Sequence, residues 1–378
     1  MRSRAGSPSG RLDFLDGLRG LAVALVLLQH IGELTVPAIE RLTSSTVQLG
    51  QLGVMVFFLC SGFIIPASLE RGRRAPGRGA ALRTFWISRV FRLYPLYWLS
   101  LAGAGLLVAA GRYVPEESLT TGHWLANAAM LQLPIGAPHA LGLYWTLAFE
   151  LLFYLAVSAL FLLSWHRRSV ALSLTASAVC LGAAAFAEPV LGRPAPLGLF
   201  CRATMFLGTV FHRWHAGEVR LRTLAGCVVT AVAAGMAMLG STADVLGAAG
   251  GPGVLPMTTA WLGAYAVFCA GIALRHRTVP AWLRRLGTIS YSVYLVQALV
   301  LLAVPALPSR LLTAVVWTAV VVGASELTYR FVEQPAVRLG RRLSDGRRVA
   351  AEPKVLVHPA RAAERPIRTT TATRRLAV

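Results

Sequence analysis

The stretch Asp13-Phe-Leu-Asp16-Gly-Leu-Arg19-Gly-Leu-Ala-Val-Ala-Leu-Val-Leu-Leu-Gln-His30 sets four ionisable side chains in a segment that is otherwise largely apolar. Such a segment is close to the ~20 residues that a helix needs to cross a bilayer. Ionisable groups inside a membrane helix are costly, and they usually mark a function or a partner. No small-x-small cleavage site follows, so the segment predicts a retained membrane helix and not a signal peptide.

The rest of the chain repeats this apolar character. Hydrophobic residues make up 56% of the 378 residues and charged residues 14%, and the mean hydropathy is +0.60. A soluble domain of this length carries more charge on its surface. We therefore predict an all-α, polytopic membrane bundle of about ten helices. The apolar segments cover residues 12–32, 46–69, 85–110, 143–164, 169–187, 198–212, 221–239, 258–275, 284–305 and 309–331.

Arginine alternates between the connections of this bundle. The second, fourth, sixth and eighth connections are rich in arginine, whereas the odd ones hold only Arg41, Arg112, Arg193 and Arg310. Basic residues favour the cytoplasmic side, so both termini are expected there. The predicted organisation is a cytoplasmic N-terminus over residues 1–11, a membrane domain over 12–336 and a basic, disordered cytoplasmic tail over 337–378.

The net charge of +21 does not indicate nucleic-acid binding, because the arginines lie between apolar runs and no nucleic-acid motif is present. The five cysteines lie in apolar segments without CxxC or metal-ligand spacing. We expect no metal, no disulfide framework and no permanently bound cofactor. The lipid bilayer is the first expected partner.

The candidate chemistry begins with His30 and Glu150. Eleven residues separate Arg19 from His30, about 16 Å of helix rise, which places His30 in the outer half of the membrane. An imidazole there can act as a general base; the alternative is a structural histidine at a helix end. Glu150 is also expected in the outer half, where it could orient His30 or hold an acceptor hydroxyl. A structural ion pair with Arg202 is the alternative for Glu150.

Arg89 and Arg92 lie one helical turn apart at the expected cytoplasmic start of a helix. Guanidinium groups bind phosphate well, so this pair, with Arg19, predicts a site for a nucleotide phosphate. The alternative is that these arginines only set the topology. Asp16, Trp145 and Arg202 are further candidates for substrate binding.

At these residues the sequence resembles the membrane-bound acyltransferase-3 family, bacterial enzymes that O-acylate sugars and some antibiotics. The likeness spans about residues 11–336. It rests on seven motifs in order: Asp16-Gly17-Leu18-Arg19 with His30, Gly53 through Phe63, Arg89 through Pro95, Trp145 through Tyr154, Arg202 with Phe206-Leu207-Gly208, Ile289 through Leu295, and Tyr329 through Pro335.

The resemblance implies a multi-pass enzyme of the bacterial plasma membrane that uses cytoplasmic acyl-CoA, with acetyl-CoA expected, as co-substrate. It implies that the donor lies near Arg89 and Arg92, that His30 is the essential base and that the acceptor is a hydroxyl of a carbohydrate or a glycosylated metabolite. Two departures stand out. Gln297 occupies a position that is often histidine in the family, and Leu151-Leu152 replace a polar pair after Glu150.

A transporter or flippase for a polar or lipid-linked substrate is the alternative function, since it also uses ionisable groups within the membrane. It predicts repeated halves with interrupted helices at matching positions. No such repeat is evident in the sequence, which favours the acyltransferase.

Overall fold

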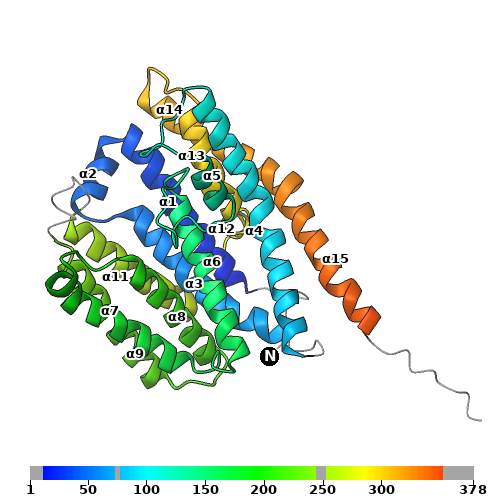
Figure 1. Ribbon diagram of the computed structural model, residues 1–378. Coiled ribbons are helices and arrows are strands. Elements are labelled where there is room, and N and C mark those ends of the chain that lie inside the picture. The colour runs from blue at the N-terminus through cyan, green and yellow to red at the C-terminus, as the bar shows by residue number, and fades with distance from the viewer. Residues whose placement is uncertain (1–11, 73–76, 244–252, 352–378) are drawn as a thin grey trace, which may run out of the picture.

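The computed structural model describes residues 12–72, 77–243 and 253–351, and these residues form helices and connections without a strand (Figure 1). The predicted all-α bundle is therefore confirmed. In chain order the helices are α1 (Asp13–Thr35), α2 (Pro37–Ser45), α3 (Leu49–Gly72), α4 (Arg78–Ala109), α5 (Thr121–Ala128), α6 (Tyr144–Leu162), α7 (Ser169–Leu191), α8 (Gly198–His215), α9 (Leu221–Gly240), α11 (Val254–Ala273), α12 (Ala281–Thr288), α13 (Ser290–Ala303), α14 (Arg310–Thr328), the π-helical turn η1 (Tyr329–Glu333) and α15 (Gln334–Ala351).

Helices α1 and α3 form the centre of the bundle. They pack against each other, and α1 also contacts α12, α13 and α14, while α3 contacts α8, α11, α4 and α6. In Figure 1, α7, α8, α9 and α11 gather on one side of this pair, and α4, α13, α14 and α15 on the other. The helix that the sequence singled out is thus surrounded by protein, which is the setting that buried charges require.

The number of membrane spans is close to the expected ten. Eight helical stretches among the described residues are long and apolar enough to span, and α12 with α13 makes a ninth, bent by 71°. The segment 284–305 was expected to be one helix and is instead this bent pair. One expected segment, 198–212, is not among these nine spans. It forms α8, an 18-residue helix that carries Arg202 and Arg213 and is less apolar than the other expected segments.

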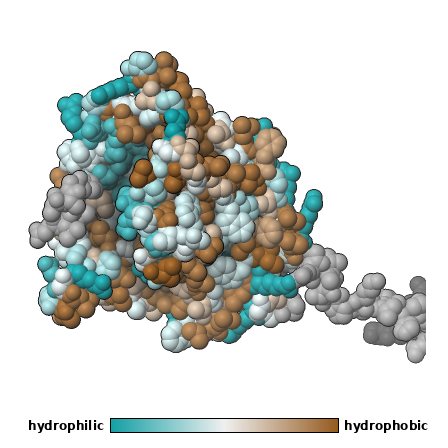
Figure 2. Space-filling model, turned by 45° about the horizontal axis from the view of Figure 1, so that its top comes forward, coloured by the Kyte–Doolittle hydropathy of each residue, from teal (hydrophilic) through white to brown (hydrophobic). Residues whose placement is uncertain are grey.

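The outer flanks of the bundle are apolar. Many large hydrophobic side chains are exposed, among them Leu106, Phe186, Val229 and Leu311. In Figure 2 brown apolar atoms cover much of the visible surface, while hydrophilic side chains gather toward its rim and around a pale hollow. A surface of this kind suits contact with lipid, in agreement with the multi-pass membrane fold.

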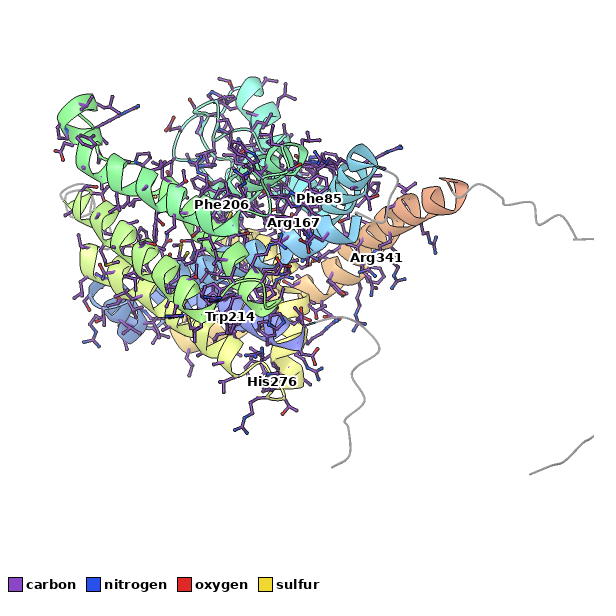
Figure 3. The ribbon with its side chains drawn as sticks, turned by 90° about the horizontal axis from the view of Figure 1, so that it is seen from below. Phe85, Arg167, Phe206, Trp214, His276 and Arg341 are labelled. Carbon is purple, nitrogen blue, oxygen red and sulfur yellow. The ribbon has the colours of Figure 1, made fainter. Side chains whose placement is uncertain are left out.

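The arginine-rich connections share one end of the molecule. Figure 3 looks at the molecule from below and labels Arg167 in the connection from α6 to α7, His276 in the connection from α11 to α12 and Arg341 on α15. The assignment of this end to the cytoplasm remains a prediction from the positive-inside rule.

Two glycines let α1 approach α12 closely. A Cβ on Gly287 would overlap the carbonyl oxygen of Asp16, and one on Gly20 would overlap the carbonyl oxygen of Leu283. Small residues allow helix backbones in membranes to touch in this way. The contact sets Arg19 beside the break between α12 and α13, where its Nη2 donates to Ser290 Oγ at 3.0 Å.

We expect Gly287→Ala to destabilise the folded protein by about 1–3 kcal/mol, because the added methyl group forces the two helices apart. Gly323→Ala is the matched control, since no atom lies within 4 Å of a Cβ built there. Thermal unfolding of both variants in detergent measures the effect. Equal midpoints for the two variants would contradict the close α1–α12 contact.

The helical part of the chain extends further than the sequence suggested. Residue 337 was expected to begin a disordered tail, but α15 continues to Ala351. The reason is packing against α4, where Gly340 lies so close to Phe91 that a Cβ would be 2.7 Å from the Phe91 Cβ. The remaining tail, residues 352–378, and the expected N-terminal segment 1–11 lie outside the described residues.

Candidate functional site

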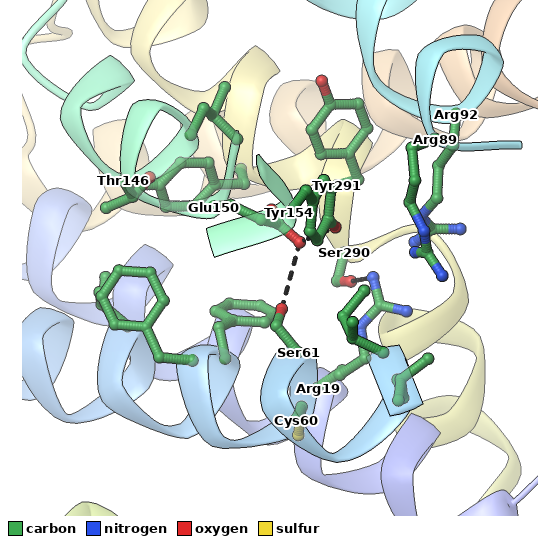
Figure 4. A pocket seen from close by; sticks show the side chains of 17 residues that line it. Arg19, Cys60, Ser61, Arg89, Arg92, Thr146, Glu150, Tyr154, Ser290 and Tyr291 are labelled. Atoms are coloured by element: carbon green, nitrogen blue, oxygen red, sulfur yellow. Dashed lines mark hydrogen bonds between the residues drawn. The ribbon is translucent and has the colours of Figure 1, made fainter. Parts of the chain in front are cut away.

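A pocket opens between α1, α3, α4, α6 and α13 (Figure 4). Its apolar part comes mainly from α3, with Phe57, Phe58 and Ile64. Its polar part holds four of the residues predicted from sequence: Arg19, Arg89, Arg92 and Glu150. These four come from three helices that are far apart in the chain, so the fold gathers them into one site.

The three arginines make this pocket strongly cationic. Arg19 and Arg92 are close enough for their charges to repel, and Arg89 lies over the Tyr154 ring with its guanidinium carbon 5.4 Å from the ring centre. Arg89 Nη2 also donates to Ser68 Oγ at 2.9 Å. Several guanidinium groups facing one space are stabilised by an anion among them, which is the condition for a phosphate site.

One carboxylate partly balances these charges from the side. Glu333 is buried, accepts a hydrogen bond from Ser292 Oγ at 2.9 Å and lies 4.0 Å from Arg92 Nη1. It ends the π-helical turn η1, a rare helix form that often occurs at functional sites. The pair orients Arg92, yet its long distance leaves the Arg92 donors available to a ligand.

Glu150 is bound by two hydroxyl groups of the pocket. Its Oε1 accepts from Ser61 Oγ at 3.1 Å and from the Tyr154 hydroxyl (Figure 4). The structure therefore does not place Glu150 against His30. It also shows no ion pair between Glu150 and Arg202 among the described residues: Arg202 Nε donates to the Gly198 carbonyl, and its guanidinium lies over Phe149.

His30 lies outside the pocket. It is half-buried on α1, and the polar side chain that it meets is Gln297 of α13, a residue to which the sequence assigned no role. The pocket reaches Tyr294, one helical turn before Gln297 on the same helix. His30 therefore lies just beyond one end of the pocket, and the three arginines lie at the other end.

The three remaining candidates do not line the pocket. Asp16 lies in the first turn of α1, near enough to Arg19 to attract its charge. Trp145 packs its ring edge-on against Phe58, with ring centres 6.3 Å apart. Arg202 lies behind Phe149. Asp16 and Trp145 thus lie beside lining residues, whereas Arg202 contacts a residue that is itself outside the lining.

Sequence reasoning missed the polar residues that complete the lining: Ser61, Thr146, Tyr154, Ser290, Tyr291 and Tyr294. All six lie inside the quoted motifs: Ser61 in Gly53 through Phe63, Thr146 and Tyr154 in Trp145 through Tyr154, and Ser290, Tyr291 and Tyr294 in Ile289 through Leu295. Within one motif, the spacing alone did not tell pocket residues from core residues.

The fold and the pocket define a multi-pass membrane protein with a partly buried site lined by three arginines. The profile of the acyltransferase-3 family, described as an acyltransferase domain, matches residues 12–325. The chain belongs to this family, and it is an acyltransferase.

Two curated relatives agree with this assignment. The chain is 29% identical over 330 residues, 80% of this chain and 93% of the relative, to the exopolysaccharide production protein ExoZ of Rhizobium meliloti (strain 1021). It is 28% identical over 154 residues, 38% of each chain, to the acyltransferase MdmB of Streptomyces mycarofaciens. No solved structure matches the chain.

Proposed function

We propose that this enzyme moves an acyl group, with acetyl as the first candidate, from acyl-CoA to a hydroxyl of a carbohydrate acceptor. The observation that carries the proposal is the meeting of Arg19, Arg89 and Arg92 with Glu150 in one pocket of an acyltransferase. A CoA thioester is a polyanion with a long, flexible arm that carries both apolar and polar groups. A site with guanidinium groups at one end and aromatic walls along α3 suits both parts of it.

In this proposal the donor phosphates bind near Arg89 and Arg92, and the arm lies along the pocket toward Tyr294. Because about 16 Å of helix rise separates Arg19 from His30, an extended arm is needed to bring the thioester near the imidazole. Phe57 and Tyr294, with ring centres 6.4 Å apart, border this end, and the Tyr294 hydroxyl and Thr146 Oγ1 are hydrogen-bonded at 2.8 Å.

His30 then acts as the general base. It takes the proton of the acceptor hydroxyl while that oxygen attacks the thioester carbonyl; the oxygen–carbon bond forms, the carbon–sulfur bond breaks, and the proton passes to the departing thiolate. Holding the acceptor and the thioester side by side lowers the activation barrier further. Glu150 serves in the donor pocket, where it holds Ser61 and Tyr154 in place and offers a carboxylate to a polar group of the arm.

The name of the longer match, an exopolysaccharide production protein, supports a polysaccharide or its lipid-linked precursor as acceptor. The shorter match to an acyltransferase covers too little of either chain to choose an acceptor. We place the enzyme in a bacterial plasma membrane, where cytoplasmic acyl-CoA and lipid-linked sugars can both reach it. A transporter is not proposed, because the family assignment makes the chain an enzyme.

The test is acyl transfer from radiolabelled acetyl-CoA in membranes that contain the protein. We expect label to move into a polysaccharide or lipid-linked sugar fraction, and not to do so in membranes from cells with an empty vector. Cys269→Ala, an exposed position on α11 away from the pocket, should behave as wild type. Label that enters only a small-molecule fraction would overturn the polysaccharide acceptor, and no transfer from any acyl-CoA would overturn the donor.

A further inference from the structure

The side chain of Gln297 is buried, and the fold leaves its amide group without a well-formed hydrogen bond. Only 1% of the residue is exposed, and neither its Oε1 nor its Nε2 makes a hydrogen bond of good geometry with any residue that the structure describes. Buried amides are almost always hydrogen-bonded, so an exception calls for a reason. The polar group with which Gln297 interacts is the imidazole of His30.

The surroundings of this pair are apolar. Val23 and Leu27 of α1 and Val293 and Val296 of α13 form part of one buried cluster between the two helices. The charged group that acts on the His30 ring is Glu33, one turn further along the same helix. In an apolar environment a single hydrogen bond to the ring has a strong orienting effect, because little water competes for it.

We propose that Gln297 is a positioning residue for His30. A neutral imidazole has one nitrogen that donates and one that accepts, and the hydrogen bond made by the first decides which nitrogen is free to take a proton. In the reacting complex, where the loose contact seen here tightens, the side-chain carbonyl of Gln297 accepts the ring N–H and leaves the other nitrogen as the base. Being uncharged, the amide does this without drawing a proton onto the ring before the acceptor arrives.

This inference rests on the proposed role of His30, and it deepens that role by naming what fixes the imidazole. It also accounts for the unsatisfied amide. An apolar side chain of similar size would fill the same space without leaving polar atoms unpaired, so packing alone gives no reason for glutamine here. The position is one turn beyond Tyr294, the last residue of α13 that lines the donor pocket.

The decisive variant is Gln297→Leu. Removing an unsatisfied buried amide should leave the thermal midpoint in detergent unchanged or raised. At the same time we expect kcat to fall by about tenfold to a hundredfold, with the KM for acetyl-CoA unchanged, because the base is no longer held in its productive tautomer. Gln297→Glu keeps an oxygen acceptor, so it should retain more activity than Gln297→Leu. Its acid limb of activity should move to higher pH, since a carboxylate favours the charged ring.

Val296→Ala controls for packing, because it alters the same apolar cluster without a polar change. If Gln297→Leu keeps the wild-type kcat and pH profile while His30→Ala is inactive, the positioning role is wrong and the proposed function stands. A Val296→Ala variant that loses as much kcat as Gln297→Leu also overturns the positioning role. If His30→Ala still transfers acyl groups, the base itself is misassigned, and Gln297 loses its role with it.

Discussion

Replacing His30 with alanine should lower kcat for acyl transfer by about 10²–10⁴-fold, the usual contribution of a general base, and leave the KM for acetyl-CoA near its wild-type value. The KM should hold because His30 lies outside the pocket that contains the three arginines. An interaction made only in the transition state changes kcat and kcat/KM together. Initial rates with labelled acetyl-CoA, at matched amounts of inserted protein, give both quantities.

His276→Ala is the matched control for this variant. His276 is an exposed histidine in the connection between α11 and α12, at the end of the bundle that Figure 3 shows. It should transfer acyl groups as wild type does. Equal rates for His30→Ala and wild type, with insertion confirmed, would remove His30 as the base. The carboxylate of Glu150 would then be the next residue to test.

The convergence of the arginines could be predicted from the sequence because each signal was local. Arg19 and the Arg89/Arg92 pair stand near the ends of long apolar segments, where a charge is either paired, exposed or functional. The alternation of arginine between connections placed both helix ends on one side. The structure brings all three into one pocket, as the sequence suggested.

The depth of Glu150 could not be predicted in the same way. Counting residues from the start of its apolar segment placed it with His30, but α6 sets it against Ser61 of α3. The register between α1 and α3 is fixed by close contacts, such as that of Gly53 with the Ala22 carbonyl, which place Ser61 about three turns nearer to Arg19 than to His30. Relative depth depends on such contacts between helices, and no periodicity within one helix encodes it.

The break between α12 and α13 was missed for a similar reason. Residues 284–305 appear as one apolar segment, yet Arg284 and Arg285 begin it, and they bind Asp13 of α1 and Glu326 of α14. These ion pairs and the close packing of Gly287 on α1 fix the short helix α12 across the end of the bundle. The chain then turns at Ile289, which delivers Ser290 to Arg19.

Arg89→Gln should raise the KM for acetyl-CoA by about tenfold to a hundredfold, the range that corresponds to the loss of one charge-assisted hydrogen bond. Arg89 is the most suitable of the three arginines for this test. Arg92 is paired with Glu333, so changing it also leaves a buried carboxylate without its cation, and changing Arg19 also removes its hydrogen bond to Ser290 at the start of α13. The neighbours of Arg89 are the Ser68 hydroxyl and the rings of Phe85 and Tyr154, which carry no charge that needs a partner.

A short thioester donor without phosphates, S-acetyl-N-acetylcysteamine, makes this test specific. If Arg89 binds the phosphates of CoA, Arg89→Gln should match wild type with the short donor and fall behind only with acetyl-CoA. Arg167→Gln, in the connection between α6 and α7, controls for a general loss of positive charge at that end. Equal losses with both donors would instead mean that Arg89 only supports the pocket.

The same pair of donors separates the two ends of the site. His30→Ala should fail with either donor, because both need a proton removed from the acceptor hydroxyl, whereas Arg89→Gln should fail only with the donor that carries phosphates. This crossed result is expected only if anion binding and proton removal reside in different residues, as they do when His30 lies about 16 Å of helix rise from Arg19, at the arginine end of the pocket. If both variants fail with both donors, anion binding and proton removal take place at one position. The extended arrangement of the donor is then wrong.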